Sequence, residues 1–384
     1  MKVPFHKPSL PDSLDLIYHD TLRSGWLTTG SIVKNFENKL ATYFNADYVI
    51  AINSCSAALH LALAAMEFKR GDKFILPTMT FVATIECGEY IGMNPILVDT
   101  EECGFLFDLN QVEDLLKNDN KIKAILPMHY GGQPVNMKIL NQFSDKYGVF
   151  ILEDAAHALE TRSNIGKVGD TKFAAAFSFY ANKNITTGGE GGALATNNAK
   201  LAQKVKALSL HGITRDGWNR FKENGKWEYD ITNLGYKYNM TDLSASFGLW
   251  QMNKLEDWQR KRKIIVLRYL NKLGNVDGII LPELNSGHAW HLFVIQLDLD
   301  RWKISRNSVI DKLNEKGIGL AVHYKPIHKL SYYKLQYGFV SKKFPRSNHL
   351  FDSIISLPIY PSLTMEEVDY VSERIVELFN KYSV

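Results

Sequence analysis

The chain has 384 residues, of which 45% are hydrophobic and 22% charged, and its formal net charge is +4. This composition is that of an ordinary globular protein, and the length fits two domains or one large domain with a smaller one. The net charge is small and there is no long block of basic residues, so charge gives no reason to expect a nucleic-acid partner. No apolar run of about 18 residues is present to cross a membrane.

The N-terminal stretch MKVPFHKPSLPDSLDL contains three prolines and no apolar core. We therefore expect no secretory signal peptide. The cysteines, Cys55, Cys87 and Cys103, lack CxxC or Cys/His metal spacing. They are typical of reduced thiols, so we expect a cytoplasmic protein without a bound metal.

Short apolar runs alternate with helical patterns in the first half of the chain. We expect strands at 48–53, 73–77, 95–100, 122–130 and 149–156, each followed by a helix or a polar turn. The runs are continuous rather than alternating, which is typical of parallel strands covered on both faces. Repeated β-α units predict a doubly wound α/β domain with a mostly parallel sheet.

The pattern changes in the second half. Residues 213–235 are rich in Trp, Arg, Lys and Gly and predict a long loop, and a long helical pattern covers 241–273. Shorter strand and helix patterns follow. We therefore expect a large domain over 1–250 and a small α+β domain over 251–384, with residues 1–25 packed on the small domain.

Polar residues collect where the expected strands end, which is where doubly wound sheets bind ligands. The turn NSCSAAL after the first strand opens a helix whose first amides can bind phosphate. The residues at these strand ends are Cys55 and Ser56, Phe81, Asp154 with His157, and, after a strand at 174–179, Ser178 and Lys183.

Each of these residues has an ordinary structural explanation when taken alone, such as a helix cap or a solvated lysine. Their order along the chain is more specific, because pyridoxal phosphate needs the same parts. It needs an amine for a Schiff base and a carboxylate that keeps its pyridine nitrogen protonated. It also needs a helix N-terminus for its phosphate and an aromatic ring against its face. The order predicts a pyridoxal-phosphate site around Lys183.

Several longer segments match a known family in the same order. They include NSCSAALHLAL (53–63), PTMTFVAT (77–84), LEDAAHALE (152–160), FSFYANKNITTGGEGG (177–192), LGYKYNMTDLSASFGL (234–249) and VHYKPIHKLSYY (322–333). On these segments the chain resembles the DegT/DnrJ/EryC1/StrS sugar aminotransferases, nearly end to end. GYKYNMTD and HAWHLF are most similar to the UDP-4-amino-4-deoxy-L-arabinose aminotransferase branch. The resemblance implies the pyridoxal-phosphate-dependent transferase fold type I, that of aspartate aminotransferase.

The resemblance implies roles around the cofactor. Lys183 would form the Schiff base, Asp154 would pair with the pyridine nitrogen, and His157 would lie beside the ring near its O3′. The remaining contacts that it implies are Phe81 stacked on the ring, and Ser178 with the amides of Cys55 and Ser56 at the phosphate.

The resemblance also implies a homodimer, with L-glutamate and a nucleotide-linked 4-ketosugar as substrates. Asn239, or alternatively Lys237, would reach the cofactor phosphate of a neighbouring subunit. Thr29, His323 and Tyr324 match segments near the sugar nucleotide.

Three segments depart from the family pattern. Ser54-Cys55-Ser56 stands where Ser-Gly-Thr is usual, TTGGEGG has one extra glycine, and GYKYNM replaces GYNYRM. The last departure leaves the cross-subunit phosphate ligand open.

Four other functions fit the same scaffold: a C3 aminotransferase, a sugar 3-dehydratase, an aromatic-amine-forming synthase and a non-enzymatic cofactor-binding regulator. The dehydratases carry His at the lysine position, so Lys183 argues against them. The nucleotide, whether UDP, GDP or dTDP, also stays open. Arg215, Trp218, Arg220 and Trp227 are candidate contacts to it, although a solvated loop at a dimer edge fits them equally well.

Overall fold

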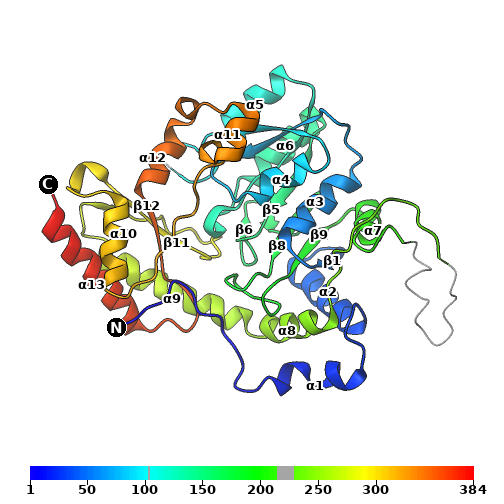
Figure 1. Ribbon diagram of the computed structural model, residues 1–384, viewed down its shortest axis with the longest axis horizontal. Coiled ribbons are helices and arrows are strands. Elements are labelled where there is room, and N and C mark those ends of the chain that lie inside the picture. Colours follow the sequence, from blue (N-terminus) through cyan, green and yellow to red (C-terminus); the bar gives the residue numbers. More distant parts are fainter. Residues whose placement is uncertain (103, 214–228) are drawn as a thin grey trace.

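The structure is a computed structural model that describes residues 1–102, 104–213 and 229–384. A seven-stranded sheet with the order β1-β9-β8-β5-β4-β2-β3 forms the centre of its larger part (Figure 1). The strands are β1 (Tyr48–Ile52), β2 (Lys73–Pro77), β3 (Asn94–Val98), β4 (Ile122–Ile125), β5 (Phe150–Asp154), β8 (Ala174–Ser178) and β9 (Gly192–Thr196).

The sheet is parallel from β8 across to β3, and β9 runs antiparallel to both β8 and β1. The reversal arises because a loop, rather than a crossover helix, joins β8 to β9, and only a crossover returns the chain in a parallel direction. The doubly wound, mostly parallel sheet is thus confirmed. β4 ends at Ile125, earlier than the expected 122–130, because Pro127 has no amide to donate to a ladder.

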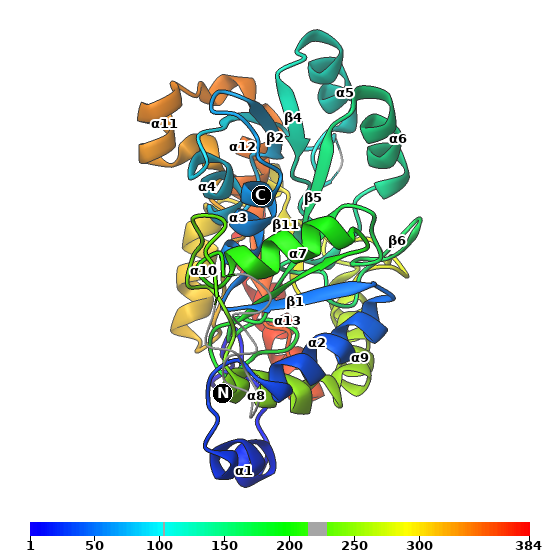
Figure 2. The same cartoon turned by 90° about the vertical axis from the view of Figure 1, so that its right-hand side faces the viewer.

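Helices cover both faces of this sheet. Alternate strand residues face opposite layers, so that Leu152 packs in the cluster of α3, α4 and α7, and Ile151 in that of α5 and α6. Figure 2 shows α3 and α4 on one side of β2, β4 and β5, and α5 and α6 on the other. The helices are α2 (Ser31–Phe44), α3 (Cys55–Ala65), α4 (Ala83–Glu89), α5 (Leu109–Asn118), α6 (Met137–Tyr147) and α7 (Ala199–Leu208).

The smaller part has a three-stranded antiparallel sheet of its own, in the order β10-β11-β12. Its elements are β10 (Ile279–Ile280), β11 (Phe293–Leu297), β12 (Ile354–Leu357), α9 (Leu255–Leu273), α10 (Arg306–Glu315) and α13 (Met365–Tyr382). Short elements complete the chain: α1 (Asp15–Ser24), η1 (Tyr130–Gly132), β6 (Arg162–Ser163), β7 (Gly166–Lys167), η3 (Leu299–Arg301), η4 (Ile327–Lys329), α11 (Ser331–Tyr337), η5 (Ser341–Lys343) and α12 (Pro345–Ser353). None of the helices in the described ranges is long and apolar enough to cross a membrane.

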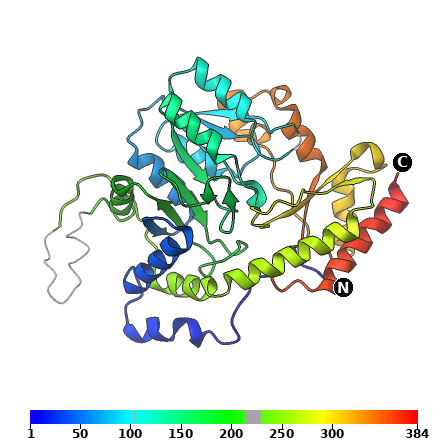
Figure 3. The same ribbon diagram turned by 180° about the vertical axis from the view of Figure 1, so that it is seen from behind.

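The expectation of one helix over 241–273 is wrong. The segment forms α8 (Asp242–Met252) and α9, which Figure 3 shows running one after the other along the molecule. The break lies at Asn253 and Lys254, whose amides donate to carbonyls three residues back rather than four. Asn253 also accepts a hydrogen bond from the distant Lys39, and asparagine is a weak helix former.

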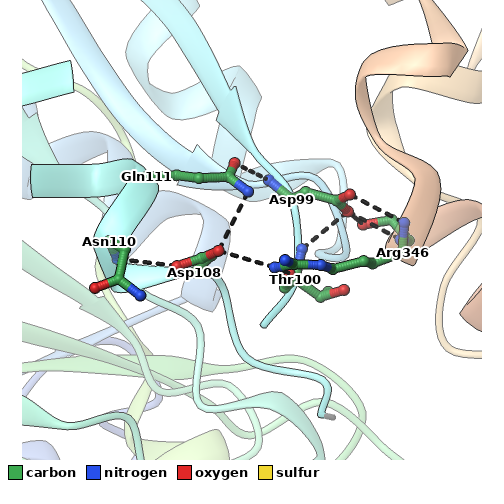
Figure 4. Close-up of polar contacts among 7 residues, drawn as sticks. Asp99, Thr100, Asp108, Asn110, Gln111 and Arg346 are labelled. Carbon is green, nitrogen blue, oxygen red and sulfur yellow. Dashed lines mark hydrogen bonds and ion pairs between the residues drawn. The ribbon is translucent and has the colours of Figure 1, made fainter. Parts of the chain in front are cut away.

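Part of the expected small domain packs on the large sheet. Ile327, Tyr333 and Phe344 belong to the same buried cluster as α3 and β2. Arg346 of α12 donates to the Thr100 carbonyl at 3.0 Å and to Asp108 Oδ2 at 2.8 Å (Figure 4). The chain therefore passes from the larger part to the smaller part at α9, and around α11 and α12 it contacts the larger part again. These segments form the boundary between the two parts.

The buried carboxylate of Asp242, the first residue of α8, holds the start of α2. Gly30 caps α2 without a side chain, and Asp242 Oδ1 instead accepts from the amides of Gly30 and Val33, both at 2.9 Å. Its Oδ2 accepts from Ile32 at 3.3 Å, and Asp242 is 2% exposed. Asp242 thus satisfies the amides that a helix start leaves open.

Asp242→Ala should lower the free energy of unfolding by about 2 kcal/mol, because buried helix amides lose their acceptor. Urea unfolding followed by circular dichroism measures the change. Asp257→Ala is the control, since that carboxylate forms only surface pairs with Arg260 and Lys261 and should change the stability much less. Equal effects in the two variants would contradict this role.

Candidate active site

Lys183 lies in a turn directly after β8. Its amide donates to the Tyr180 carbonyl at 3.0 Å, which closes the turn. Among the described residues, none forms a hydrogen bond or ion pair with its Nζ. Burial lowers the pKa of the Lys183 amine to about 8, although the nearby Cys55 and Asp154 oppose the shift. The unprotonated, nucleophilic fraction of the amine near neutral pH is therefore much larger than in an ordinary lysine.

Asp154 ends β5, the strand next to β8, and is 3% exposed. Its Oδ2 accepts from Thr84 Oγ1 at 2.7 Å and its Oδ1 from the Ala156 amide at 3.1 Å. Burial raises the pKa of Asp154, while these bonds and the Lys183 charge lower it. A buried carboxylate without an ion pair among the described residues suits a ligand that brings a positive charge, such as a protonated pyridine nitrogen.

The start of α3 forms an anion cradle. Ser54 Oγ caps the helix by accepting from Ala57 at 3.1 Å, so the Cys55 and Ser56 amides remain open as first-turn donors. Gly192 of β9 lies against this turn so closely that a Cβ would be 2.5 Å from Cys55 N. Ser178, at the end of β8, stands at the same edge of the sheet.

The unusual Ser-Cys-Ser turn is accommodated by the direction of its thiol. Cys55 Sγ points inward and donates to the Ala176 carbonyl at 3.4 Å, while the residue is 8% exposed. Burial raises the pKa of this thiol well above its usual value, so it stays protonated. The backbone amides therefore remain available although no glycine is present.

Phe81 follows β2 and is 52% exposed, an unusual state for a phenylalanine beside a sheet. Its ring lies 5.8 Å from that of Tyr324, with an interplanar angle of 47°. An open aromatic face at this point can stack on a planar ring held between Lys183 and Asp154.

A fixed hydrogen-bond chain runs behind the site. The Gly131 amide donates to His157 Nδ1 at 3.2 Å, and a backbone amide can only donate. Burial lowers the pKa of His157 well below its usual value, so the ring is neutral and its proton is assigned to Nε2. Nε2 then donates to Tyr324 Oη at 2.9 Å. The Tyr324 hydroxyl proton remains free to donate to a ligand.

Two histidines lie near Lys183: His323, which the sequence placed near the sugar nucleotide, and His291, to which the sequence assigned no role. His291 Nδ1 lies 2.9 Å from Asn184 Oδ1, next to the lysine, and its ring is 4.3 Å from that of His157. His323 Nδ1 lies 2.8 Å from Ser356 Oγ, and the hydroxyl of Tyr130 donates to its carbonyl. The matched segment HAWHLF pointed to His291, but its contact with the lysine turn needed the tertiary structure.

Thr29 and Asn239, expected at different ligands, lie together. Asn239 Nδ2 donates to Thr29 Oγ1 at 2.7 Å, and Lys237 Nζ donates to Asn239 Oδ1 at 2.6 Å. Asn239 also bridges to Ile52 at the end of β1, which places it near the start of α3. Its contact with a neighbouring subunit stays a prediction. Arg215, Trp218, Arg220 and Trp227 lie outside the described residues.

The extended glycine loop has a defined path. Gly188 and Gly189 have φ angles of +89° and +131°, values that side chains disfavour. Gly189 N donates to Thr186 Oγ1 at 3.2 Å, and Thr187 Oγ1 donates to the Glu190 carbonyl at 2.6 Å. The extra glycine therefore serves the tight return of the chain from Lys183 to β9.

A cavity of about 640 Å³ lies in another part of the molecule. It lies between the loop after β3 and the small sheet, and it includes Tyr130 and Gly131 but neither Lys183 nor Asp154. Lys183 and Asp154, whose pKa values burial shifts, lie together at the strand ends. We therefore place the reactive site there rather than in this cavity.

This geometry can be compared with known proteins. The model of the DegT/DnrJ/EryC1/StrS aminotransferase family matches residues 15–376. The chain belongs to this family. It is 39% identical over 382 residues to the spore coat polysaccharide biosynthesis protein SpsC of Bacillus subtilis, covering 96% of this chain and 97% of that one.

Solved structures agree with the assignment. The putative sugar aminotransferase Spr1654 from Streptococcus pneumoniae, in its PMP form, superposes with a TM-score of 0.91 at 32% identity, covering 99% of this chain and 100% of that one. That protein has also been solved in a PLP form. Helicobacter pylori PseC has a TM-score of 0.92 at 24% identity, covers both chains completely, and supports the fold alone. The fold is therefore the type I fold of pyridoxal-phosphate-dependent aminotransferases.

The lowered pKa of Lys183 can be measured on cofactor-free protein. Trinitrophenylation of Lys183, located by peptide mass spectrometry, should titrate with a midpoint near pH 8. At pH 8 its neutral fraction should be on the order of 10²-fold larger than that of an ordinary lysine. Lys117 is the reference, because its bonds to Asp114 raise its pKa. A Lys183 midpoint as high as that of Lys117 would contradict the buried-amine geometry.

Proposed function

We propose that the protein is a pyridoxal-phosphate-dependent aminotransferase that converts a nucleotide-linked 4-ketosugar into the 4-amino sugar, with L-glutamate as the amino donor. The observation that carries the proposal is the amine of Lys183 beside the buried carboxylate of Asp154 at neighbouring strand ends. Family membership supports the reaction class, and a lysine at this position favours amino transfer over dehydration.

Residues of this chain fit the cofactor. The Cys55 and Ser56 amides with Ser178 would hold its phosphate, Asp154 its pyridine nitrogen, and Phe81 one ring face. When bound, pyridoxal phosphate supplies an aldehyde that accepts an amino group and a ring that takes up the electron pair released at carbon.

The protein side chains then handle the protons. Lys183 Nζ takes a proton from the α-carbon of the amino donor, and later returns one to the sugar carbon that carried the ketone. Its lowered pKa suits both directions near pH 8. The Tyr324 hydroxyl, oriented by His157, can donate to an oxygen in the site, and the neutral His157 adds no competing charge.

The substrate part of the proposal rests on likeness. The similarity of GYKYNMTD and HAWHLF to the arabinose branch favours a UDP-linked sugar with its ketone at C4. The name of SpsC, a spore coat polysaccharide biosynthesis protein, favours a role in bacterial surface glycans. Amination at C3 is the alternative.

A homodimer is also part of the proposal. Asn239 would complete the phosphate site of the partner. The N-terminal part of the chain carries four exposed leucines that a partner could cover: Leu10, Leu14, Leu22 and Leu27 are 44–59% exposed. Single exposed leucines are common, but a group of this kind is typical of an interface.

Lys183→Ala should retain cofactor but lose the visible absorbance of lysine-bound cofactor, and turnover should fall at least about 10³-fold. Absorbance spectra and a coupled 2-oxoglutarate assay measure this. Lys167→Ala is a matched control, because burial also lowers the pKa of Lys167 to about 8 while its Nζ lies over the ring of Tyr43. Wild-type turnover in Lys183→Ala would end the proposal.

A panel of nucleotide ketosugars tests the substrate. Purified protein, L-glutamate and UDP-, GDP- or dTDP-linked 4-ketosugars, with a 3-ketosugar as comparison, should give a 4-amino sugar whose regiochemistry NMR reports. We expect the UDP sugars to have the highest kcat/KM. Amination at C3 alone would contradict the C4 assignment while leaving the reaction class intact.

A further inference from the structure

The first nine residues start beside the small domain and lead toward α1 (Figure 1). Val3 is completely buried; its amide donates to the Gly317 carbonyl at 2.8 Å, and its carbonyl accepts from Gly319 at 2.8 Å. Six residues later, the Ser9 carbonyl accepts from Gln251 Nε2 of α8 at 2.8 Å. The segment is thus anchored on both parts of the molecule.

Between these anchors, Phe5 and His6 contact the walls of the active site. The Phe5 ring stacks on His323 with centroids 5.7 Å apart and an interplanar angle of 30°. His6 Nε2 lies 3.2 Å from the Ala181 carbonyl, and its ring lies edge-on to Tyr360 at 6.2 Å. A carbonyl only accepts, so Nε2 carries the proton.

The His6 ring stays uncharged at physiological pH. Burial lowers the pKa of His6 to about 4, and the positive charges of Arg262 and Lys183 add to the shift, while the bond to Ala181 opposes it. The ring is therefore neutral at physiological pH, and one tautomer donates throughout the working range.

The acceptor belongs to the turn that carries the reactive lysine. Ala181 lies within the turn closed by the Lys183 amide on the Tyr180 carbonyl. On the far side of the lysine, the Thr186 amide donates to Gln251 Oε1 at 3.4 Å, and this is the side chain that holds Ser9. The N-terminal segment thus reaches the lysine segment from both sides.

We propose that residues 3–9 act as a strap that positions Lys183, with His6 as the positioning residue. The strap links the turn of Lys183 to residues 317–319 of the small domain. It also links the turn to His323, which we expect near the sugar nucleotide. The strap thereby fixes the position of Lys183 Nζ relative to the residues expected around the sugar. This inference rests on the proposed role of Lys183.

Three variants of His6 and one control test the strap. His6→Ala removes the donor, His6→Gln places an amide near the position of Nε2, and His6→Asn carries the same amide one methylene short. Lys7→Ala is the control, because Lys7 is an exposed neighbour in the same segment. Thermal unfolding and circular dichroism are recorded for each, so that folding and positioning are separated.

The first readout is Lys183 trinitrophenylation in cofactor-free protein. In His6→Ala and His6→Asn the loosened turn admits water, so the midpoint should rise by about one pH unit and the rate at pH 8 should fall about fivefold. His6→Gln and Lys7→Ala should stay within twofold of wild type. The holoenzyme should show a fall of about tenfold in kcat, with the KM for glutamate within twofold, in the same two variants.

Two results would overturn the strap. One is an unchanged Lys183 midpoint in folded His6→Ala or His6→Asn, and the other is His6→Gln behaving like His6→Asn. The pH midpoint of Lys183 is measured without cofactor, so this test does not depend on whether the protein catalyses the proposed reaction. If His6→Ala does not fold, the comparison between Gln and Asn still decides.

Discussion

The structure depends on one constraint: an amine and a carboxylate are removed from water at the ends of two neighbouring strands. Lys183 follows β8 and Asp154 ends β5, and these strands are parallel neighbours in the sheet. Burial lowers the pKa of the first and raises that of the second, which shifts both toward their neutral forms. Pyridoxal phosphate suits such a site, because it reacts with a neutral amine and supplies a positive charge to the carboxylate.

The layers around the sheet serve this arrangement. The largely apolar helix α3, with nine of its eleven residues buried, directs its open first amides toward the strand ends. The chain from the Gly131 amide through His157 to Tyr324 fixes one tautomer and leaves one hydroxyl proton available. The small domain adds His291 and His323, so the polar wall of the site is assembled from segments far apart in the sequence.

Departures from the family pattern have physical explanations in this chain. The Cys55 thiol turns inward to Ala176, which keeps the first amides of α3 open without a glycine. The close approach of β9 is permitted by Gly192 instead, where a Cβ would clash with the Cys55 amide. The additional glycine at 188–189 takes up backbone angles that other residues avoid.

The sequence by itself determined the mostly parallel sheet and most of its strands, although not β9, and it predicted the residues at the strand ends, because continuous apolar runs and the order of the motifs are local signals. It could not determine the break between α8 and α9, since a helical pattern continues through Asn253 while the change in bonding does not appear in it. Nor could it place His6 beside Ala181 or Asp242 at the start of α2, because these contacts span 175 and 212 residues. Such contacts are fixed only when the two parts of the chain pack together, and that packing also sets the pKa of Lys183 through burial.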